Sequence, residues 1–523
     1  ISSLFRLAFT IQSFFIYPIS KGIGKIMEEQ KEGTTRTPKE GSEVIRDTKE
    51  AEERLRLELA NIKRPGVSFI KDIKIPYEME ASNFLFMGGM GSGKTLAFIM
   101  RLLRQFYNRG NRTMVADIKG DFTRVWGEET GVKIFTPLDS RSIAWDISQD
   151  LENELEAVEF LNYMIPVDSS GSSAAYFQKA ASDITLGIII SLQHEKPRNW
   201  NMIDIFNVMN DEKLLISCLQ KYRKGALKHL ADSGFDEQEN FVASKLTTMI
   251  FSDIRAHLQN LEFLAKAWPI STGGFSIKKY ARGEITEIKM IILPFNSYYK
   301  TFSEFFVSMI LDFFFRSIFS LPENYEERIG IFLDELGVIP KIPNFVEATK
   351  TLRTRGGSMY VAFQDCGVVD SKYKSDGGTE AIFNGFGTKC IGLARTPQYA
   401  EYFVRAFGKN TYEKITKTKN EVISEGRRRV SMSTQYEKIV EDAVATGELI
   451  ALPKASKENP IATFFIQLEG ISIIFKLGIP TVKDEERFEP IKIAEWINSP
   501  SLIIIDKKEE LENVENTTFL GNK

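Results

Sequence analysis

The eight residues from 88 to 95, GGMGSGKT, constrain the fold of this chain more than any other stretch. They fit the pattern G-x-x-x-x-G-K-[ST], they follow the apolar run Phe84–Met87, and they precede the amphipathic segment Leu96–Phe106. Strand, glycine-rich loop and helix in this order form the context that a phosphate-binding loop requires. We therefore expect a loop that encloses phosphate groups here, rather than a glycine-rich turn that matches the pattern by chance.

The residue types of this loop suit the chemistry of phosphate binding. Glycine has no Cβ, so the backbone N–H groups can close around an anion, and the following helix adds its positive end to the same place. We expect the Lys94 ammonium on the β- and γ-phosphates and the Thr95 hydroxyl on the metal, with ATP and Mg²⁺ as the cofactors. The predicted nucleotide-binding residues are Gly88, Gly89, Met90, Gly91, Ser92, Gly93, Lys94 and Thr95.

A second motif supplies carboxylates. Four apolar residues, Gly330–Leu333, are followed directly by Asp334 and Glu335, which is the Walker B pattern. Asp334 is expected to hold Mg²⁺ through water, and Glu335 to orient and activate the attacking water. Acidic residues often follow strands, so this pattern alone is a weak predictor of a nucleotide site. It becomes a strong predictor when it occurs in the same chain as the loop at 88–95. Thr95 and Asp334 must then lie within a few ångströms of one metal ion, although 239 positions separate them.

The stretch between the two motifs changes character. Residues 150–267 carry helical periodicity over Glu152–Met164, Ala174–Gln193, Asp211–Gln220 and Asn240–Ala267, with few strand signals. The alternation of strands and helices then resumes. Because a nucleotide-binding core needs only a few elements between its motifs, this block is expected to be an inserted domain. The predicted fold class is α/β, a RecA-like P-loop NTPase core with a mainly parallel sheet plus an inserted all-α domain.

The predicted domain organisation follows from these shifts in pattern. The expected segments are 1–25, the possible end of a membrane helix; 26–72, a charged linker or stalk; 73–149, the first part of the nucleotide-binding domain; 150–267, the inserted all-α domain; 268–482, the second part of the nucleotide-binding domain; and 483–523, an acidic C-terminal tail.

Both ends of the chain leave alternatives open. The apolar stretch 4–19 is shorter than the roughly 20 residues that cross a bilayer, so it is either the cytoplasmic end of a membrane helix or an interfacial or buried helix. Residues 26–64 are highly charged, with a helical pattern at Glu50–Ala60, and predict a solvated linker or stalk. The acid-rich tail from Lys483 onward is expected to be a solvated, partly flexible terminus or a site for a basic partner.

Charged and amide side chains follow several predicted strands. Asp117, Asp139 and Arg141 either border the ligand site or act in turns and caps. Gln364 follows a strand, where its amide can reach the γ-phosphate or the attacking water, unless it is a solvent-facing turn residue.

Arg353 and Arg355 lie in a short basic turn before the same strand. Either arginine could act as a finger at a neighbouring subunit's nucleotide, contact DNA phosphates, or be an ordinary surface charge.

The charge of the whole chain limits how it can bind nucleic acid. The net charge is −3, so a DNA partner requires a local basic patch or a lined channel. The polar stretch 408–437 has seven Lys or Arg against three Glu between Lys409 and Arg429 and predicts a functional or disordered loop. This stretch and Lys221–Lys224 are the candidate pore loops. The three cysteines have no metal-ligand spacing and indicate reduced thiols.

These residues together resemble a known family. The chain is similar to the type IV secretion coupling proteins of conjugative systems, nearest to the TraD/TrwB-like branch, over residues 73–475. The resemblance depends on the phosphate loop, the run Asp117–Phe122, the run Pro137–Trp145, Phe332–Glu335, and Arg353 eleven positions before Gln364. The helical block also lies where this family has its all-alpha domain.

The resemblance implies a function and a place in the cell. It implies a homo-hexameric ATPase ring at the cytoplasmic face of the bacterial inner membrane, which pumps single-stranded DNA bound to a relaxase towards the type IV secretion channel. Members of the family usually carry two N-terminal membrane helices, of which residues 1–25 are expected to be at most a fragment. By the same resemblance the ATP-site residues are Lys94, Thr95, Asp334, Glu335 and Gln364, and Arg353 is the finger that acts in trans.

Two other functions share these motifs. An FtsK/HerA-type motor that translocates double-stranded DNA has the same core, although the helical block and the lack of a recognisable winged-helix tail disfavour FtsK. A docking platform that passes protein substrates to a channel could use the helical block and the acidic tail. A small-molecule kinase is disfavoured because no substrate-positioning Asp motif accompanies the loop.

Overall fold

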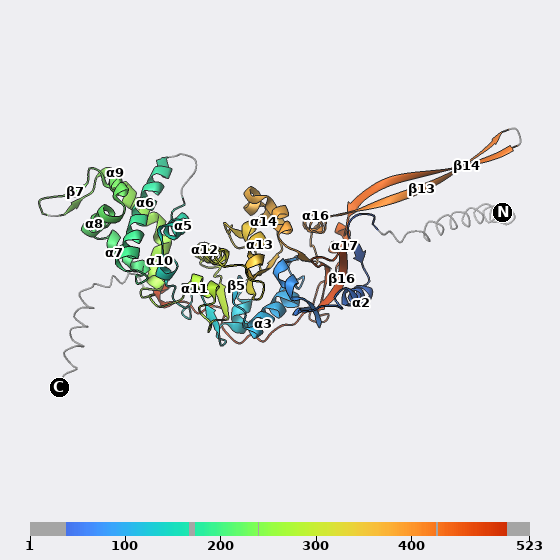
Figure 1. The fold of residues 1–523 in the computed structure, drawn as a ribbon, viewed down its shortest axis with the longest axis horizontal. Coiled ribbons are helices and arrows are strands. Elements are labelled where there is room, and N and C mark those ends of the chain that lie inside the picture. The colour runs from blue at the N-terminus through green and yellow to red at the C-terminus, as the bar shows by residue number, and fades with distance from the viewer. Residues whose placement is uncertain (1–37, 167–172, 239, 425–426, 499–523) are drawn as a thin grey trace, which may run out of the picture.

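The computed structural model describes residues 38–166, 173–238, 240–424 and 427–498. Its central feature is a ten-stranded sheet (Figure 1). The strands are β1 (Glu43–Ile45), β4 (Phe84–Met87), β5 (Thr113–Asp117), β6 (Val132–Ile134), β9 (Met290–Pro294), β10 (Ile329–Leu333), β11 (Gly357–Phe363), β12 (Thr388–Ile391), β15 (Ile461–Gln467) and β16 (Ile473–Pro480).

The order of strands across the sheet is β1-β16-β15-β12-β4-β11-β10-β5-β9-β6. Neighbouring strands are parallel, except that β15 runs antiparallel to both β12 and β16. The predicted α/β class with a mainly parallel sheet is therefore confirmed.

The sheet is buried on both faces because side chains alternate along each strand. In β4, Phe84 and Phe86 pack on one face, whereas Leu85 and Met87 pack on the other. The first face is covered by α2 (Thr48–Glu58), α3 (Met100–Arg109), α4 (Asp121–Trp126) and a separate ribbon of β2 (Pro65–Ile70) and β3 (Ile73–Pro76). The second face is covered by α11 (Ile277–Arg282), α12 (Lys300–Phe319), α13 (Phe345–Thr351), α14 (Cys366–Tyr373), α15 (Gly378–Asn384), α16 (Pro397–Arg405) and α17 (Thr446–Ile450).

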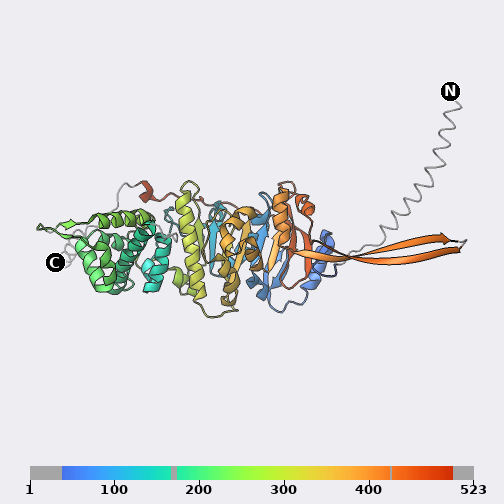
Figure 2. The same ribbon diagram turned by 90° about the horizontal axis from the view of Figure 1, so that it is seen from above.

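A helical lobe, residues 154–267, lies between β6 and β9 in the chain and at one end of the molecule (Figures 1 and 2). Its elements are α5 (Glu154–Met164), α6 (Ser173–Glu195), α7 (Met202–Met209), α8 (Glu212–Tyr222), the 3₁₀ turn η4 (Lys224–Leu230), the short hairpin β7 (Gly234–Phe235) and β8 (Phe241–Val242), α9 (Lys245–His257) and α10 (Gln259–Ala267). Its two strands lie outside the ten-stranded sheet. The helical periodicity over 240–267 corresponds to two helices, which begin at Lys245 and are divided at Leu258.

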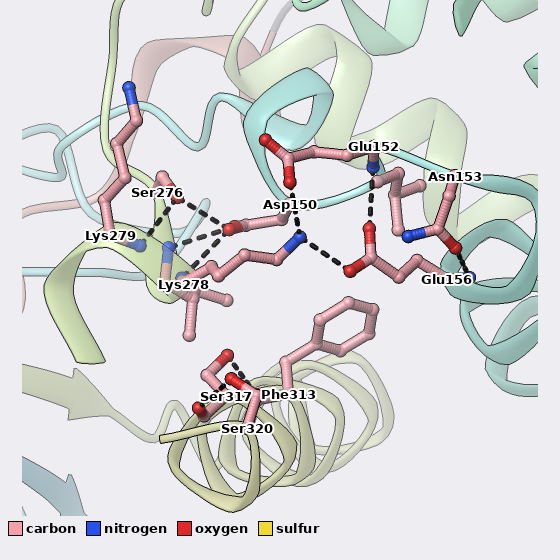
Figure 3. Close-up of polar contacts among 12 residues, drawn as sticks. Asp150, Glu152, Asn153, Glu156, Ser276, Lys278, Lys279, Phe313, Ser317 and Ser320 are labelled. Carbon is pink, nitrogen blue, oxygen red and sulfur yellow. Dashed lines mark hydrogen bonds and ion pairs between the residues drawn. The ribbon is translucent and has the colours of Figure 1, made fainter. Parts of the chain in front are cut away.

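The two chain crossings between sheet and lobe are tied together by polar side chains (Figure 3). The buried Asp150 carboxylate accepts hydrogen bonds from Trp145 Nε1 at 2.7 Å, Ser276 Oγ at 2.7 Å and the backbone N of Lys278 at 2.9 Å. Lys278 Nζ in turn pairs with Glu156 at 2.6 Å. A buried carboxylate is stable only when it is satisfied in this way, so these contacts fix the lobe to the core.

The charged segment before the sheet is part of the core. β1 pairs in parallel with β16, and α2 buries Ala51 and Leu55 against the sheet. The expectation of a solvated stalk is therefore wrong for residues 43–58. The four Glu, two Arg and one Lys of α2 obscure its narrow apolar stripe in the sequence, and this stripe packs against the sheet.

The polar stretch 408–437 is not a loop. It belongs to an antiparallel hairpin of β13 (Lys409–Ser424) and β14 (Arg427–Asp442), paired from Lys409↔Asp442 to Ser424↔Arg427. The hairpin projects from the end of the sheet opposite the helical lobe (Figures 1 and 2). Its sequence includes Thr, Tyr, Ile and Val, which favour strands, but the interspersed charges hide that signal.

The beginning of the acidic tail is also ordered. We call residues 481–498 the strap, because they run from β16 to the helical lobe. The backbone N of Lys492 donates to Asp139 at 3.0 Å, Trp496 Nε1 donates to the Pro137 carbonyl at 2.6 Å, and the Trp496 ring lies 5.9 Å from that of Phe263 in the lobe. Most of residues 483–498 stay accessible to solvent, but these contacts hold them against the surface of the core and the lobe.

The possible membrane segment, residues 1–25, lies outside the described residues. Among the helices that the structure does describe, none has both the length and the apolar character needed to span a bilayer.

Candidate nucleotide-binding site

The phosphate-loop sequence adopts the strand–loop–helix arrangement that it predicts. β4 ends at Met87, and the helix after the loop begins with a π-helical turn at Thr95–Ile99 before continuing as α3. Gly91 and Gly93 have φ angles of +78° and +88°, which side chains rarely adopt. A Cβ on Gly93 would also lie 2.7 Å from the Cβ of Ala462. Glycine is therefore required here by the backbone and by its neighbours.

Lys94 lies inside the turn that the loop makes. Its side-chain Nζ donates to the Gly88 carbonyl at 2.5 Å and lies 3.5 Å from Ser92 Oγ. Burial lowers the pKa of Lys94 to about 8, against the opposing attraction of the Glu335 and Asp334 carboxylates. The ammonium is thus held against the loop backbone at the point where the loop would enclose an anion.

The two sequence motifs meet as predicted. Thr95 Oγ1 donates a hydrogen bond to Asp334 Oδ1 at 2.8 Å, and Lys119 Nζ lies 3.7 Å from Asp334 Oδ2. Asp334 follows β10, which is separated from β4 by β11 alone. Because these strands are parallel, their carboxyl ends lie at the same edge of the sheet, where ligands bind in such folds.

Glu335 and Gln364 form a pair beside this contact. Gln364 follows β11 and donates its Nε2 to Glu335 Oε2, and its backbone N donates to Glu335 Oε1 at 3.3 Å. Burial raises the pKa of Glu335, while the charge of Lys94 and the hydrogen bond from Gln364 oppose that rise. Gln364 thus lies beside the cavity with the Glu335 carboxylate as its partner, and its contact with phosphate or water stays a prediction.

A cavity of about 370 Å³ opens beside the loop. Its walls come from the phosphate loop, the start of the following helix, the turn after β5, α4, the residue after β11 and the strap. The lining residues are Met90, Gly91, Ser92, Gly93, Lys94, Thr95, Leu96, Met100, Lys119, Asp121, Val125, Gln364, Lys483, Asp484 and Glu486. The cavity therefore brings the predicted phosphate-loop residues and Gln364 around one space, together with residues from two further segments.

The other charged strand ends act in local structure. Asp117 Oδ2 accepts hydrogen bonds from the backbone N of Thr123 at 2.7 Å and from its hydroxyl at 2.6 Å, and so holds the turn into α4. Asp139 forms an ion pair with Arg141 at 2.7 Å and also accepts from the strap. None of these three predicted residues lines the cavity, so the turn-and-cap alternative is confirmed for them.

Arg353 and Arg355 lie at the opposite edge of the sheet from the cavity, where the strand β11 begins. Both belong to the 3₁₀ turn η5 (Leu352–Arg355), which precedes β11, whereas Gln364 follows it. Seven strand residues at about 3.3 Å each separate the two ends by roughly 20 Å. Arg353 pairs with Glu469 at 2.5 Å, and Arg355 Nε donates to the Leu321 carbonyl at 3.0 Å. Neither arginine reaches the cavity of its own chain, and action in trans stays a prediction.

Comparison with known proteins decides the family. A sequence model of the type IV secretion-system coupling protein DNA-binding domain matches residues 67–459. The match includes the phosphate loop, the helical lobe, the Walker B carboxylates and Gln364. The chain belongs to this coupling-protein family.

Individual relatives agree with this assignment. The coupling protein TraD of Escherichia coli (strain K12) is 23% identical over 350 residues, which are 66% of this chain and 46% of TraD. The chain thus spans less than half the length of that relative. Two solved structures, the bacterial conjugative coupling protein TrwBdeltaN70 and the plasmid coupling protein TrwB in complex with ADP and Mg²⁺, each give a TM-score of 0.65 at 17% identity. They match 88% of this chain and 97% and 99% of their own chains, which confirms the fold.

Sequence patterns missed part of the site of this coupling-protein chain. Lys119 and Asp121 lie in the charged run after β5, and that run was the available signal for them. Lys483, Asp484 and Glu486 had no signal, because a charged segment after a final strand is typical of a solvated terminus. The strap therefore adds a wall to the site that only the structure reveals.

Proposed function

We propose that the chain is an ATP-hydrolysing motor that couples relaxase-bound DNA to a type IV secretion channel and pumps single-stranded DNA during conjugation. The observation that carries the proposal is the meeting of Thr95, Asp334, Glu335 and Gln364 beside the phosphate loop. Membership of the coupling-protein family favours this function over an FtsK/HerA-type motor. The TrwB structures with ADP and Mg²⁺ and with a non-hydrolysable ATP analogue support ATP and Mg²⁺ as cofactors.

The side chains fit these cofactors. The Thr95 hydroxyl and the Asp334 carboxylate present oxygen atoms 2.8 Å apart, and oxygen ligands are those that Mg²⁺ prefers. Bound there, the metal would neutralise charge on the phosphates. Lys94 would contact the β- and γ-phosphates, and Glu335 would accept the proton of the attacking water. Gln364 would hold the Glu335 carboxylate in place.

Arg353 suits a role at a neighbouring subunit. It lies at the opposite end of β11 from Gln364, so it cannot serve the nucleotide of its own chain. In a homo-hexameric ring with ATP sites at subunit boundaries, it would stabilise transition-state charge at the next site. Opening and closing of these boundaries would then drive the stepping along DNA.

DNA binding is proposed to depend on the sugar–phosphate backbone, which makes it sequence-tolerant and salt-sensitive. The candidate pore segment Lys221–Lys224 is already engaged within the lobe, because Lys221 pairs with Glu195 at 2.6 Å and Arg223 with Asp183 at 2.8 Å. The basic sequence of the β13–β14 hairpin is then the stronger candidate. The remaining proposed partners are the relaxosome proteins, the secretion channel and the inner membrane, reached through residues 1–25.

The proposed domain limits place the docking surfaces. Residues 150–267, predicted to be all-α but containing the short hairpin of β7 and β8, would act as a separate, mainly helical domain at the end of the ring subunit, suited to recognising the relaxase. The motor domain would consist of two parts, residues 73–149 and 268–482. The strand β1 and the helix α2, from residues 43–58, would extend it. Residues 499–523 continue the proposed acidic tail.

The test is ATP turnover measured against protein concentration, with and without single-stranded DNA. The motor predicts that turnover rises steeply with concentration and rises further with DNA, because the sites form between subunits. Turnover indifferent to both would contradict it. Stimulation by double-stranded DNA alone would favour the FtsK/HerA-type alternative, and relaxase capture by the chain without any DNA effect would favour the docking platform.

A further inference from the structure

The nucleotide cavity has a wall that faces the phosphate loop, and the strap forms it. Lys483, Asp484 and Glu486 line the cavity together with the loop. The strap begins directly after β16, where the backbone N of Val482 lies 3.5 Å from the Leu96 carbonyl. The wall is therefore attached to the helix that begins at the loop.

Contacts on both sides of Glu486 hold the wall in place. Asp484 pairs with Arg104 on α3, and its side chain is only 8% exposed. Beyond Glu486, the backbone N–H groups of Arg487 and Phe488 donate to the Arg124 carbonyl at 2.8 and 2.9 Å. The strap is thus anchored to α3 before Glu486 and to α4 after it, so Glu486 occupies a defined position.

The two walls carry opposite charge. On the loop side, the Lys94 and Lys119 ammonium groups outnumber the Asp121 carboxylate. On the strap side, the Asp484 and Glu486 carboxylates outnumber the Lys483 ammonium group. A hydrogen bond from Lys483 lowers the pKa of Glu486, so this carboxylate is charged at neutral pH. Phosphate groups are repelled by the strap and attracted to the loop. A nucleotide must then place its uncharged nucleoside towards the strap.

The space between the walls suits a nucleoside. Leu96, Met100 and Val125 line it and offer apolar surface against which a flat base can pack. Asp484 is occupied by Arg104, whereas the Glu486 side chain is 43% exposed and its contacts are to Lys483 at 2.8 Å and Arg124 at 3.8 Å. A carboxylate has about four acceptor positions, so Glu486 can accept further hydrogen bonds.

We propose that residues 483–486 form the nucleoside wall of the site and that Glu486 accepts a hydrogen bond from a ribose hydroxyl, so that the protein prefers ribonucleotides to deoxyribonucleotides. This inference rests on the proposed nucleotide-binding function of the loop. The hydroxyl donates and the carboxylate accepts, an interaction that a deoxyribose lacking that hydroxyl does not make.

The test is calorimetric binding of ADP, 2′-deoxy-ADP, 3′-deoxy-ADP and inorganic pyrophosphate in the presence of Mg²⁺. A hydrogen bond to a charged group contributes about 1.5–3 kcal/mol, which is roughly a 10- to 100-fold preference for ADP over one of the deoxy forms. Glu486→Ala removes the acceptor, so it should abolish that preference and weaken ADP binding by a similar factor, while pyrophosphate binding stays the same. Glu486→Gln keeps a neutral carbonyl acceptor and should retain only part of the preference. Glu485→Gln, which removes the same charge from an exposed neighbour outside the cavity, should change neither.

Two results would overturn the inference. Equal affinity of the wild-type chain for ADP and both deoxy forms would exclude a ribose contact, and an unchanged preference in Glu486→Ala would exclude this carboxylate as the acceptor. Either result leaves pyrophosphate binding intact, and with it the proposed function. If the wild-type chain bound neither pyrophosphate nor ADP, the loop would not be a phosphate-binding site. Both the proposed function and this inference would then be wrong.

Discussion

The Thr95 hydroxyl lies 2.8 Å from the Asp334 carboxylate although 239 positions separate the two residues. Thr95 follows the strand β4 through the phosphate loop, and Asp334 follows β10, two strands away in the same parallel sheet. The chain enters the helical lobe after β6 and returns to the sheet at β9. Both strands lie beyond β5, on the far side from β4, so the lobe does not separate β4 from β10. A nucleotide on the loop must therefore face the Walker B carboxylates.

Substitutions at Lys94 and Glu335 should separate binding from hydrolysis. Lys94→Ala removes a charged contact to the phosphates, and nucleotide affinity should fall about 10- to 100-fold with loss of turnover. Glu335→Gln keeps the size and polarity of the side chain but removes the base. It should lower turnover by about 10²–10⁴-fold and leave the Kd for ATP within about threefold.

The measurements are steady-state ATP turnover and equilibrium binding of ATP to each variant. Full hydrolysis by Glu335→Gln would show that this carboxylate does not activate the water. Full binding by Lys94→Ala would remove the loop lysine from the phosphate site.

Gln364 should act through Glu335. Its side-chain amide and its backbone N–H each donate to the carboxylate, so Gln364→Ala removes one of the two hydrogen bonds that hold Glu335. We expect turnover to fall about 10- to 100-fold, because misplaced catalytic groups lose rate steeply, while ATP affinity is unchanged. Comparison of kcat with the Kd for ATP checks this. A loss confined to affinity would assign Gln364 to phosphate binding instead.

Arg353 can be tested by mixing two inactive variants. Arg353→Ala subunits keep a complete loop but lack the finger, and Lys94→Ala subunits keep the finger but lack the loop. If the arginine acts in trans, a mixture should recover part of the turnover that each variant lacks alone. The mixture should show no recovery if Arg353 only maintains its ion pair with Glu469. Arg355→Ala, which removes the arginine two positions further along the same turn, should retain most of the wild-type turnover.

The stability of the chain should depend on pH through Asp117. Burial raises the pKa of this carboxyl from 3.8 to about 6. The folded state therefore binds more protons than the unfolded state between these values, and stability rises as the pH falls through that window. Between pH 7 and pH 4.5, the free energy of unfolding of wild type should gain about 2 kcal/mol relative to that of Asp117→Asn. A difference in urea unfolding that is the same at both pH values would contradict this shift.

Local patterns were enough to predict the centre of the fold. β4, β5, β10 and β11 are short apolar runs bounded by glycine or charge, and such runs are typical of strands buried on both faces. The chemistry of one shared metal ion then required Thr95 and Asp334 to meet. Neither inference needed information about long-range pairing.

The edges of the molecule could not be predicted in the same way. β1 has three residues and is a strand because β16 offers it a partner, so no local signal identifies it. The hairpin of β13 and β14 is held by backbone pairing along a charged sequence. The strap is fixed by main-chain contacts to Arg124 and Asp139, which have no sequence pattern. In each case a partner distant in sequence decides the conformation.

The most direct test of the shared site is a double-mutant cycle on Mg²⁺-dependent ATP binding with Thr95→Ala, Asp334→Asn and the double variant. If both side chains serve one metal ion, each single substitution should abolish most of the gain in affinity that Mg²⁺ gives. The double variant should then be little worse than either single variant, because the effects of residues that act together are not additive. Additive losses, or a gain from Mg²⁺ that survives both substitutions, would contradict the account.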